Sequence, residues 1–374
     1  MCRIAKLAPC TSILALLTLA GCSNNVTLSS KSSGSNSVNP PPNVPIMQYY
    51  AYGDSITAGY LLTNPGAQAY PALVASKENV PLSNRAYSGE MACDLPPSQI
   101  FFFGDSPALS PHIASSVLIG TNDENVKGVG AYEAVFTLCH QATLSWLGVP
   151  AEYKVLANGN SMKTTGPGAI DTANHWNAWT TGGEGSTVSF AIVTPTTGPI
   201  YAWPIIDDTN SSTYSYSLDG VVMGTGTTKT TPAIVTQNGV INSLGFIRIS
   251  PVAAGTHVVT FTQTSKGTNG VSVVGIGAPD GSPSGALPTV FAGTIPYQNP
   301  GPPGGACTAA TDQPCQEYIQ DIEADVNLFT GDGLDIRLFD TRLYMHGTAA
   351  EMADGLHPNA LGQMELSQSV EAVW

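Results

Sequence analysis

The sequence is short of charge, and above all of positive charge. Charged residues make up 11% of its 374 residues, with 13 Lys and Arg against 27 Asp and Glu, for a formal net charge of −14. An average soluble domain has roughly 25% charged residues. No basic run occurs along the chain. Because nucleic-acid binding needs Lys and Arg gathered against phosphates, that class of partner is excluded.

Several motifs of common enzyme classes are also missing. There is no Gly-x-Ser-x-Gly, which excludes the usual nucleophile elbow of α/β-hydrolases. There is no His-Glu-x-x-His and no phosphate-binding P-loop, so neither the common zinc-protease motif nor nucleotide hydrolysis is indicated. No cysteine has the spacing of a metal ligand. We therefore expect neither a metal nor a cofactor.

What is abundant points to an exported, turn-rich protein. Hydrophobic residues make up 42% of the chain, enough for a sizeable core, and Gly 39 with Pro 28 supply many turns. The length allows one to three domains. Low charge together with much Gly, Pro, Ser and Thr is typical of exported proteins rich in β-structure.

The first residues resemble a bacterial lipoprotein signal. Arg3 and Lys6 precede an apolar stretch, 13–19, which is far shorter than the ~20 residues that span a bilayer. It ends in Leu-Ala-Gly-Cys at 19–22, which is similar to a lipobox and implies cleavage before Cys22 and lipidation of its thiol. The alternative is an ordinary signal with an incidental cysteine. We expect a signal peptide over 1–21, a Ser- and Pro-rich tether over 22–45, and a periplasmic or cell-surface location on a membrane.

The remaining cysteines predict two disulfides. Once Cys2, Cys10 and Cys22 are set aside, four are left, and an even number in an oxidising compartment favours disulfide pairs. Cys307 and Cys315 flank a short loop and are the first expected pair. Cys93 and Cys139 follow by elimination.

Four short blocks then suggest one site. Strand-like residues 47–52 lead into Gly-Asp-Ser-Ile-Thr-Ala-Gly, which contains Ser55. Gly89 follows a second strand-like run, and Asn122 follows a third, in Gly-Thr-Asn-Asp. Asp354 and His357 stand in Asp-Gly-Leu-His-Pro-Asn near the end. The carboxyl ends of parallel strands meet at one edge of a sheet, where ligand sites collect.

These blocks resemble those of the SGNH (GDSL-type) hydrolases, in the same chain order. The resemblance implies a flavodoxin-like three-layer α/β/α fold with Ser55 as nucleophile. It also implies an oxyanion hole formed by the backbone N–H groups of Ser55 and Gly89 and by the side-chain amide of Asn122. A second Gly-Asp-Ser contains Ser106, but this serine follows the glycine block and so falls in the wrong order.

The residue types at these positions also indicate nucleophilic catalysis by serine, independently of the resemblance. A serine hydroxyl is a poor nucleophile until a base removes its proton. His357 is the only histidine of six with an acid three residues earlier, Asp354, which can orient the imidazole. Pro358 biases His357 away from helical backbone, so the histidine is predicted on a loop that enters a helix.

Residues 150–280 have a different pattern. Short alternating runs separated by Asp-Gly and Asn-Gly turns predict an antiparallel β-sandwich, inserted between two hydrolase parts, 46–149 and 281–374. Two stretches of it, 183–190 and 253–260, are similar to galactose-binding-like jelly rolls. Its aromatic residues could stack on sugars or could pack in a core. These are Trp176, Trp179, Tyr201, Trp203, Tyr214 and Tyr216.

The sequence is thus interpreted as an exported serine esterase that acts on acyl, chiefly acetyl, esters of carbohydrates. The alternatives are a lipid or aryl esterase, a thioesterase, or an inactive carbohydrate-binding lipoprotein. The acyl group, the alcohol and the oligomeric state stay open.

Overall fold

The computed structural model describes residues 45–104, 112–172, 175–279, 287–300 and 307–374. Its α/β part is built on a five-stranded parallel sheet with the order β17-β16-β3-β1-β2. Counted along the chain, this is the 2-1-3-4-5 order of flavodoxin-like folds, so the predicted fold class is confirmed. The strands are β1 (Gln48–Gly53), β2 (Leu82–Asn84), β3 (Ile113–Leu118), β16 (Thr289–Gly293) and β17 (Ile336–Phe339).

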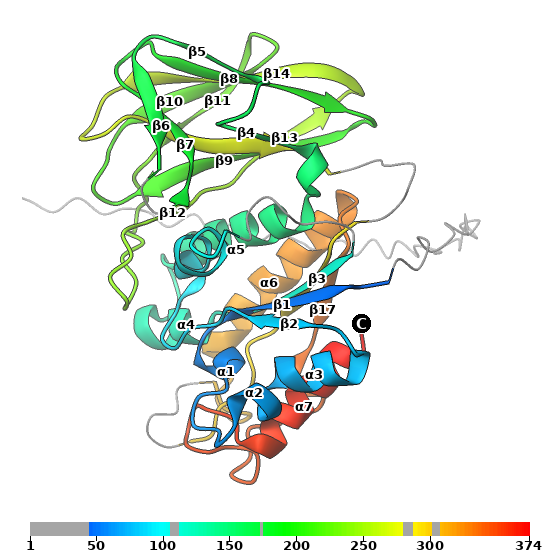
Figure 1. Ribbon diagram of the computed structural model, residues 1–374. Coiled ribbons are helices and arrows are strands. Elements are labelled where there is room, and N and C mark those ends of the chain that lie inside the picture. The colour runs from blue at the N-terminus through cyan, green and yellow to red at the C-terminus, as the bar shows by residue number, and fades with distance from the viewer. Residues whose placement is uncertain (1–44, 105–111, 173–174, 280–286, 301–306) are drawn as a thin grey trace, which may run out of the picture. The chain divides into compact units, whose positions relative to one another are not determined.

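Helices cover both faces of this sheet and give the three layers (Figure 1). On one face α3 (Tyr70–Glu78) packs beside α7 (Ala360–Glu371), and on the other α5 (Glu133–Gly148) packs beside α6 (Gln313–Gly331). In α6, Ile319, Ile322, Val326 and Phe329 are buried. Their spacing of three and four residues places them on the helix face that meets the sheet.

Short elements make up the rest of this part. The α-helical ones are α1 (Ser55–Ala58), α2 (Pro65–Gln68) and α4 (Thr121–Lys127). Three are short 3-10 turns, η1 (Ala92–Asp94), η3 (Ala151–Tyr153) and η5 (Thr341–Leu343), and η2 (Leu95–Ile100) is a π-helical segment. Within the described ranges, no helix has both the length and the apolar character that crossing a bilayer requires.

The predicted inserted sandwich is present, with two antiparallel sheets. One sheet has the strand order β11-β10-β14-β8-β5. Its strands are β11 (Val221–Thr227), β10 (Thr213–Leu218), β14 (Gly255–Ser265), β8 (Thr187–Thr194) and β5 (Met162–Thr165). The other sheet has the strand order β12-β9-β15-β7-β6. Its strands are β12 (Asn242–Leu244), β9 (Gly198–Asp207), β15 (Ser272–Gly277), β7 (Ala178–Thr181) and β6 (Gly168–Asp171). Two further strands join this second sheet, β4 (Lys154–Leu156) against β15 and β13 (Ile247–Val252) against β9.

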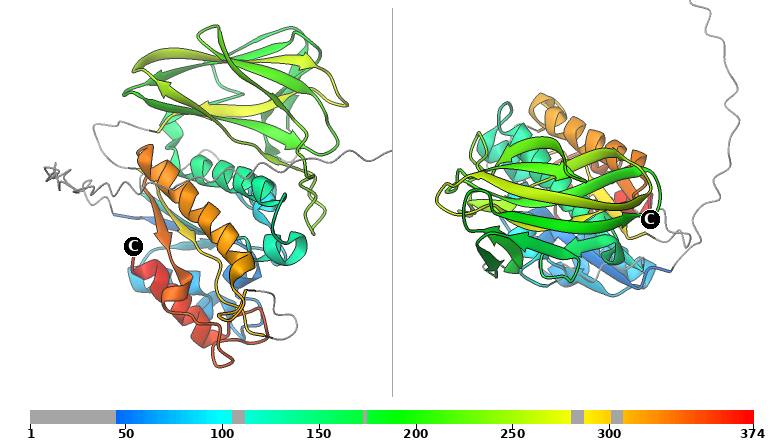
Figure 2. Two further views of the ribbon diagram at one scale, coloured as in Figure 1. Left: turned by 180° about the vertical axis from the view of Figure 1, so that it is seen from behind. Right: turned by 90° about the horizontal axis from the view of Figure 1, so that it is seen from above.

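The sandwich lies next to α5 of the α/β part (Figure 2). Buried residues of both parts belong to one hydrophobic core. Trp203 of β9 packs edge-on against Trp146 of α5 with ring centroids 4.8 Å apart, and its indole N–H donates to Ser145 Oγ at 3.0 Å. Tyr201 donates to Asp332, just after α6, at 2.7 Å. The sequence did not predict β9 as a strand, because Pro199 and Pro204 interrupt a run without alternation. Through Tyr201 and Trp203, this strand forms much of the contact between the sandwich and the α/β part.

Both disulfides expected from the cysteine count are present. Cys93 bonds to Cys139 with Cα atoms 5.0 Å apart, which ties η1 to α5. Cys307 bonds to Cys315 with Cα atoms 5.5 Å apart, at the start of α6. The first of these fixes a turn that, as described below, contacts the candidate site.

Candidate active site

Ser55 lies at the carboxyl edge of the sheet, on the first turn after β1. The strand ends at Gly53, and the Asp54 side chain caps α1 by accepting from the Ile56 N–H at 2.9 Å. At Gly53, φ is +154° and an added Cβ would lie 2.4 Å from both the Leu118 carbonyl oxygen and Thr57 Oγ1. Only glycine fits there, so Gly53 and Asp54 serve the turn that presents Ser55.

His357 and Asp354 lie together on the loop before α7, as predicted. His357 Nδ1 is 2.9 Å from Asp354 Oδ2. The other carboxylate oxygen, Oδ1, accepts from the backbone N–H groups of Leu356 and His357, each at 2.7 Å. The carboxylate is therefore held in one orientation against the imidazole.

The three side chains form one hydrogen-bonded chain. His357 Nε2 is 3.0 Å from Ser55 Oγ, although the two residues are 302 positions apart. Burial by itself would raise the pKa of Asp354, but the hydrogen bonds from the His357 ring and from two backbone N–H groups lower it below its usual value. An ionised Asp354 favours the tautomer with a proton on Nδ1, which leaves Nε2 free to accept the serine proton.

Gly89 and Asn122 lie on the segments that follow β2 and β3. Gly89 has φ +83°, a conformation that glycine adopts at little cost. Asn122 Nδ2 donates to the Glu90 carbonyl oxygen at 2.8 Å and lies 3.4 Å from Asp54 Oδ2. The sheet edge thus brings together the glycine segment, Asn122 and the Ser55 turn.

Two buried glutamines, neither of them selected in the sequence analysis, hold these segments. Gln99 accepts from Gly53 N–H at 3.0 Å, donates to the Gly53 carbonyl oxygen at 2.7 Å, and also bonds to the Glu90 carboxylate. Gln363 of α7 donates to the Ile56 carbonyl oxygen at 2.9 Å and accepts from Tyr70 N–H at 2.8 Å. Neither belongs to a short motif, so only the structure reveals them.

Four buried carboxyl groups gather beneath the site, and we call them the carboxyl cluster: Asp54, Glu90, Asp94 and Asp123. Burial raises the pKa of Asp94 to about 6, of Asp54 to about 7, and of Glu90 and Asp123 to about 8. Hydrogen bonds from backbone or side chains lower each of these values without cancelling the effect of burial. The cluster therefore holds protons at a pH where an unfolded chain would have released them.

This predicts that stability falls as the pH rises through the acid side of neutrality. For a carboxyl whose pKa is raised on folding, the folded state binds more protons than the unfolded state between the two pKa values. The slope is about 1.4 kcal/mol per pH unit for one group. We expect Asp123→Asn, which removes one such group, to show a smaller loss of melting temperature than wild type between pH 5 and 7. Asp335→Asn, at a residue paired with Arg337 at 2.9 Å, is the control and should follow wild type. Equal slopes in all three proteins would contradict the prediction.

The inserted sandwich reaches this site. Residues 228–241, between β11 and β12, extend from the sandwich toward α4 (Figures 1 and 2). We call them the β11–β12 loop. Its Thr236 donates to Asp94 Oδ1 at 2.7 Å, and the Gln237 side-chain amide donates to the Gly89 carbonyl oxygen. No local sequence pattern predicts this contact, because Gln237 and Gly89 are 148 positions apart.

Most of the insert's aromatic residues pack in the protein interior. Tyr201 and Trp203 are 0% exposed, Trp176 3% and Tyr214 4%, so these four cannot offer a sugar a stacking surface. The Asp208 carboxylate accepts from the N–H groups of Ile234 and Val235 at 2.9 Å each. This carboxylate shapes the β11–β12 loop.

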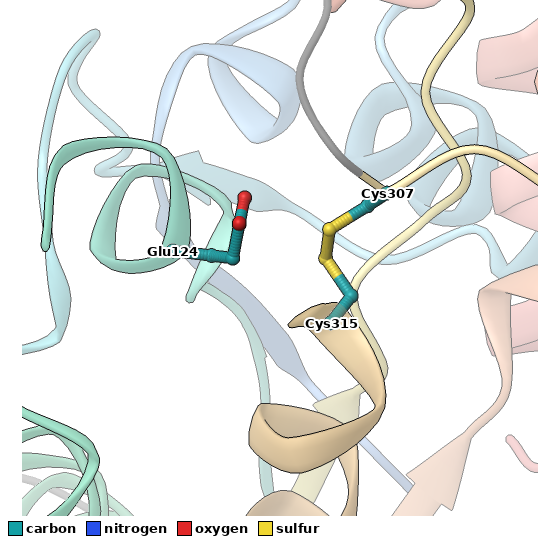
Figure 3. Close-up of side chains that lie close together, drawn as sticks. All are labelled: Glu124, Cys307 and Cys315. Carbon is teal, nitrogen blue, oxygen red and sulfur yellow. A yellow bond between two sulfur atoms is a disulfide. The ribbon is translucent and has the colours of Figure 1, made fainter. Parts of the chain in front are cut away.

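One group of side chains in the described ranges has the closeness of metal ligands: Glu124, Cys307 and Cys315 (Figure 3). The two sulfur atoms are bonded to each other, so neither is the thiolate that a metal would bind. We do not assign a metal site to them.

The other residues considered in the sequence analysis either lie outside the described residues or have partners elsewhere. Ser106, Cys22, the signal and almost all of the tether lie outside the described residues. Among the other histidines, the buried His140 has its Nδ1 2.7 Å from Asp325 Oδ2, between α5 and α6, and His257 Nδ1 is 2.8 Å from Asp219 Oδ2 on the sandwich. Both have partners away from Ser55.

No protein-family model matches the sequence, and no curated protein sequence is similar to it. Among solved structures, the chain is similar to two members of the lipolytic protein G-D-S-L family, one of them described as putative. The one from Veillonella parvula has 10% identity, a TM-score of 0.41, and coverage of 88% of this chain and 98% of that one. The one from Desulfitobacterium hafniense has 9% identity, a TM-score of 0.39, and coverage of 88% and 99%.

A third similar structure is a two-domain esterase active on acetylated mannans, with 10% identity, a TM-score of 0.35, and coverage of 62% of this chain and 89% of that one. The first two structures are of the G-D-S-L family, which is the family that the four sequence blocks resemble. The sheet order and the hydrogen bonds of the site, rather than these distant alignments, carry the interpretation that follows.

Proposed function

We propose that this protein is a serine esterase in which Ser55 is the nucleophile, His357 the general base and Asp354 its orienting carboxylate. The observation that carries the proposal is the hydrogen-bonded chain from Ser55 Oγ through the imidazole to Asp354, with distances of 3.0 and 2.9 Å. It stands at the carboxyl edge of a parallel sheet, where such open α/β folds bind ligands.

The reaction follows from this geometry. Ser55 Oγ attacks the ester carbonyl carbon while His357 Nε2 takes the hydroxyl proton. The imidazolium then protonates the departing alcohol, which leaves an acyl group on Ser55. Water, deprotonated by the same imidazole, attacks the acyl-enzyme and releases the acid, which restores the serine.

The negative oxygen formed at each attack needs donors aimed at it. We assign these to the backbone N–H groups of Ser55 and Gly89 and to the Asn122 side-chain amide. The first belongs to an α1 turn whose cap is Asp54. Asn122 is held beside the Gly89 segment by its bond to the Glu90 carbonyl.

The favoured substrates are acylated carbohydrates. Tyr60, 49% exposed, has its ring centroid 4.8 Å from that of His357. Tyr87, 67% exposed, immediately precedes the Ser88-Gly89 segment. Exposed tyrosine rings with polar hydroxyls suit a ligand that has both apolar faces and hydroxyl groups. The side-chain amides of Gln237 and Asn238 add polar groups to the same surroundings.

We further propose that the protein works outside the cytoplasm, as a lipoprotein anchored through Cys22. The lipobox-like residues at 19–22 support this, and so do the two disulfides, which persist in oxidising compartments.

An ester panel tests the function. The panel consists of acetylated sugars, p-nitrophenyl esters, lysophospholipids and acyl thioesters, assayed with the protein from residue 46 onward. We expect the highest kcat/KM with acetylated sugars, measurable turnover of p-nitrophenyl acetate, and much lower values for lysophospholipids. A clear preference for lysophospholipids or thioesters would replace the carbohydrate assignment. Binding of sugars without turnover of any ester would favour the inactive alternative.

A further inference from the structure

The β11–β12 loop is fixed at the candidate site from two sides. Within the sandwich, Asp208 accepts from the Ile234 and Val235 N–H groups. From the α/β part, Lys127 Nζ donates to the Val235 carbonyl oxygen at 2.6 Å. The Tyr132 hydroxyl donates to the Ile234 carbonyl oxygen at 3.4 Å. The loop is therefore hydrogen-bonded to both the sandwich and the α/β part.

Its tip is a tight turn centred on Gln237 and Asn238. The Gly239 N–H donates to the Thr236 carbonyl oxygen at 3.0 Å, and the Val240 N–H donates to Thr236 Oγ1 at 3.1 Å. Thr236 Oγ1 in turn donates to Asp94 Oδ1 at 2.7 Å. One buried hydroxyl thus closes the turn and attaches it to the carboxyl cluster, so Gln237 has a defined position.

Gln237 lies directly over Gly89. Its Nε2 donates to the Gly89 carbonyl oxygen. A Cβ added to Gly89 would lie 3.0 Å from that nitrogen and 3.4 Å from Asn238 Oδ1. The side chain of Gln237 is exposed, so the contact is not the by-product of a buried core.

This contact bears on the backbone that carries a proposed oxyanion donor. The two carbonyl groups following the Gly89 N–H are each held: that of Gly89 by Gln237, and that of Glu90 by Asn122 at 2.8 Å. At φ +83° a glycine has few steric limits on rotation about its neighbouring bonds. Without Gln237, the Gly89 segment would keep only the second of these anchors.

We propose that Gln237 of the inserted domain is a positioning residue for the Gly89 oxyanion donor, so that the insert completes the catalytic centre. This rests on the proposed esterase function. It also changes the expected role of the insert. An insert that only stacked on sugars, one of the two roles considered for its aromatic residues, would affect glycosidic substrates alone, whereas a residue that orients Gly89 affects the hydrolysis of every ester, however small.

The test compares Gln237→Glu with wild type on p-nitrophenyl acetate, a substrate too small to need a carbohydrate subsite. Glutamate keeps the side-chain length but, when ionised, cannot donate to the Gly89 carbonyl. Loss of a whole oxyanion donor costs about 100- to 1000-fold in kcat, so misplacement of one should cost about 10- to 100-fold. We expect that fall in kcat with KM changed less than about two-fold, because the lost interaction forms mainly in the transition state.

Two further variants make the result specific. Gln237→Lys, whose ammonium group can donate to the same carbonyl, should recover part of the lost kcat. Val235→Ala, in the same loop, should match wild type, because Val235 contacts Lys127 through its backbone carbonyl, which alanine keeps. If Gln237→Glu melts several degrees below wild type, Gln237→Ala takes its place, since it adds no charge near Asp94.

The outcomes separate this inference from the proposed function. A wild-type protein that hydrolyses no ester overturns the function itself. An active wild type with fully active Gln237 variants overturns only the positioning role. A rise in KM with unchanged kcat would also overturn it, because that pattern means that Gln237 binds substrate without acting on the transition state.

Discussion

Replacing Ser55 by alanine is expected to lower kcat/KM for p-nitrophenyl acetate by about four orders of magnitude or more, because no other group can take over the covalent step. The melting temperature should change little, since Ser55 is a small residue at the first turn of α1 and the cap made by Asp54 remains. The measurement is initial rates with protein of matched concentration and verified fold. Residual turnover should resemble that of the oxyanion hole alone.

The matched control for this prediction is Ser106→Ala, which alters the other Gly-Asp-Ser of the chain. It should leave kcat/KM within a few-fold of wild type. The double variant Ser55→Ala with His357→Ala should be no worse than Ser55→Ala by itself, because groups that act as one unit are not additive. A comparable loss from Ser106→Ala, or retained activity in Ser55→Ala, would remove Ser55 from the proposed role.

The sequence sufficed for those parts of the fold that local patterns encode. The apolar runs before Ser55 and Asn122 are strands β1 and β3, because each is bounded by glycine and polar turn residues. Apolar residues recur at helical spacing within 316–329, and this segment lies inside α6. The disulfide pairs followed from an even count and a short loop. In each case the signal lies within a few residues of the element that it predicts.

The rest depends on contacts between distant segments. Strand β9 is almost continuously buried between the sandwich core and the α/β part, so it lacks the alternation that reveals a half-exposed strand. Gln99, Gln363 and Gln237 act on backbone groups far along the chain, and an isolated glutamine carries no local signature. The sequence therefore predicts the residues proposed to react, but not the glutamines that position their backbone segments.

Asp354→Asn is the second change expected to have a very large effect, and the structure gives the reason. Asp354 Oδ1 accepts from the Leu356 and His357 N–H groups, so the oxygen of an asparagine would take that place. Its NH₂ group would then face His357 Nδ1, which could only accept. The imidazole would carry its proton on Nε2, the nitrogen 3.0 Å from Ser55 Oγ, and could no longer remove the serine proton.

The expected fall in kcat is about 10⁴-fold, the size seen when a triad carboxylate becomes an amide that imposes the wrong tautomer. The loop should stay folded, because both backbone bonds to the retained oxygen survive. Asp340→Asn is the matched control: its Oδ1 accepts from the Arg342 N–H at 3.0 Å, an asparagine oxygen can do the same, and activity should stay within a few-fold of wild type. A near-normal kcat in Asp354→Asn would mean that His357 takes its orientation from other contacts, and that the carboxylate is not needed to stabilise the imidazolium.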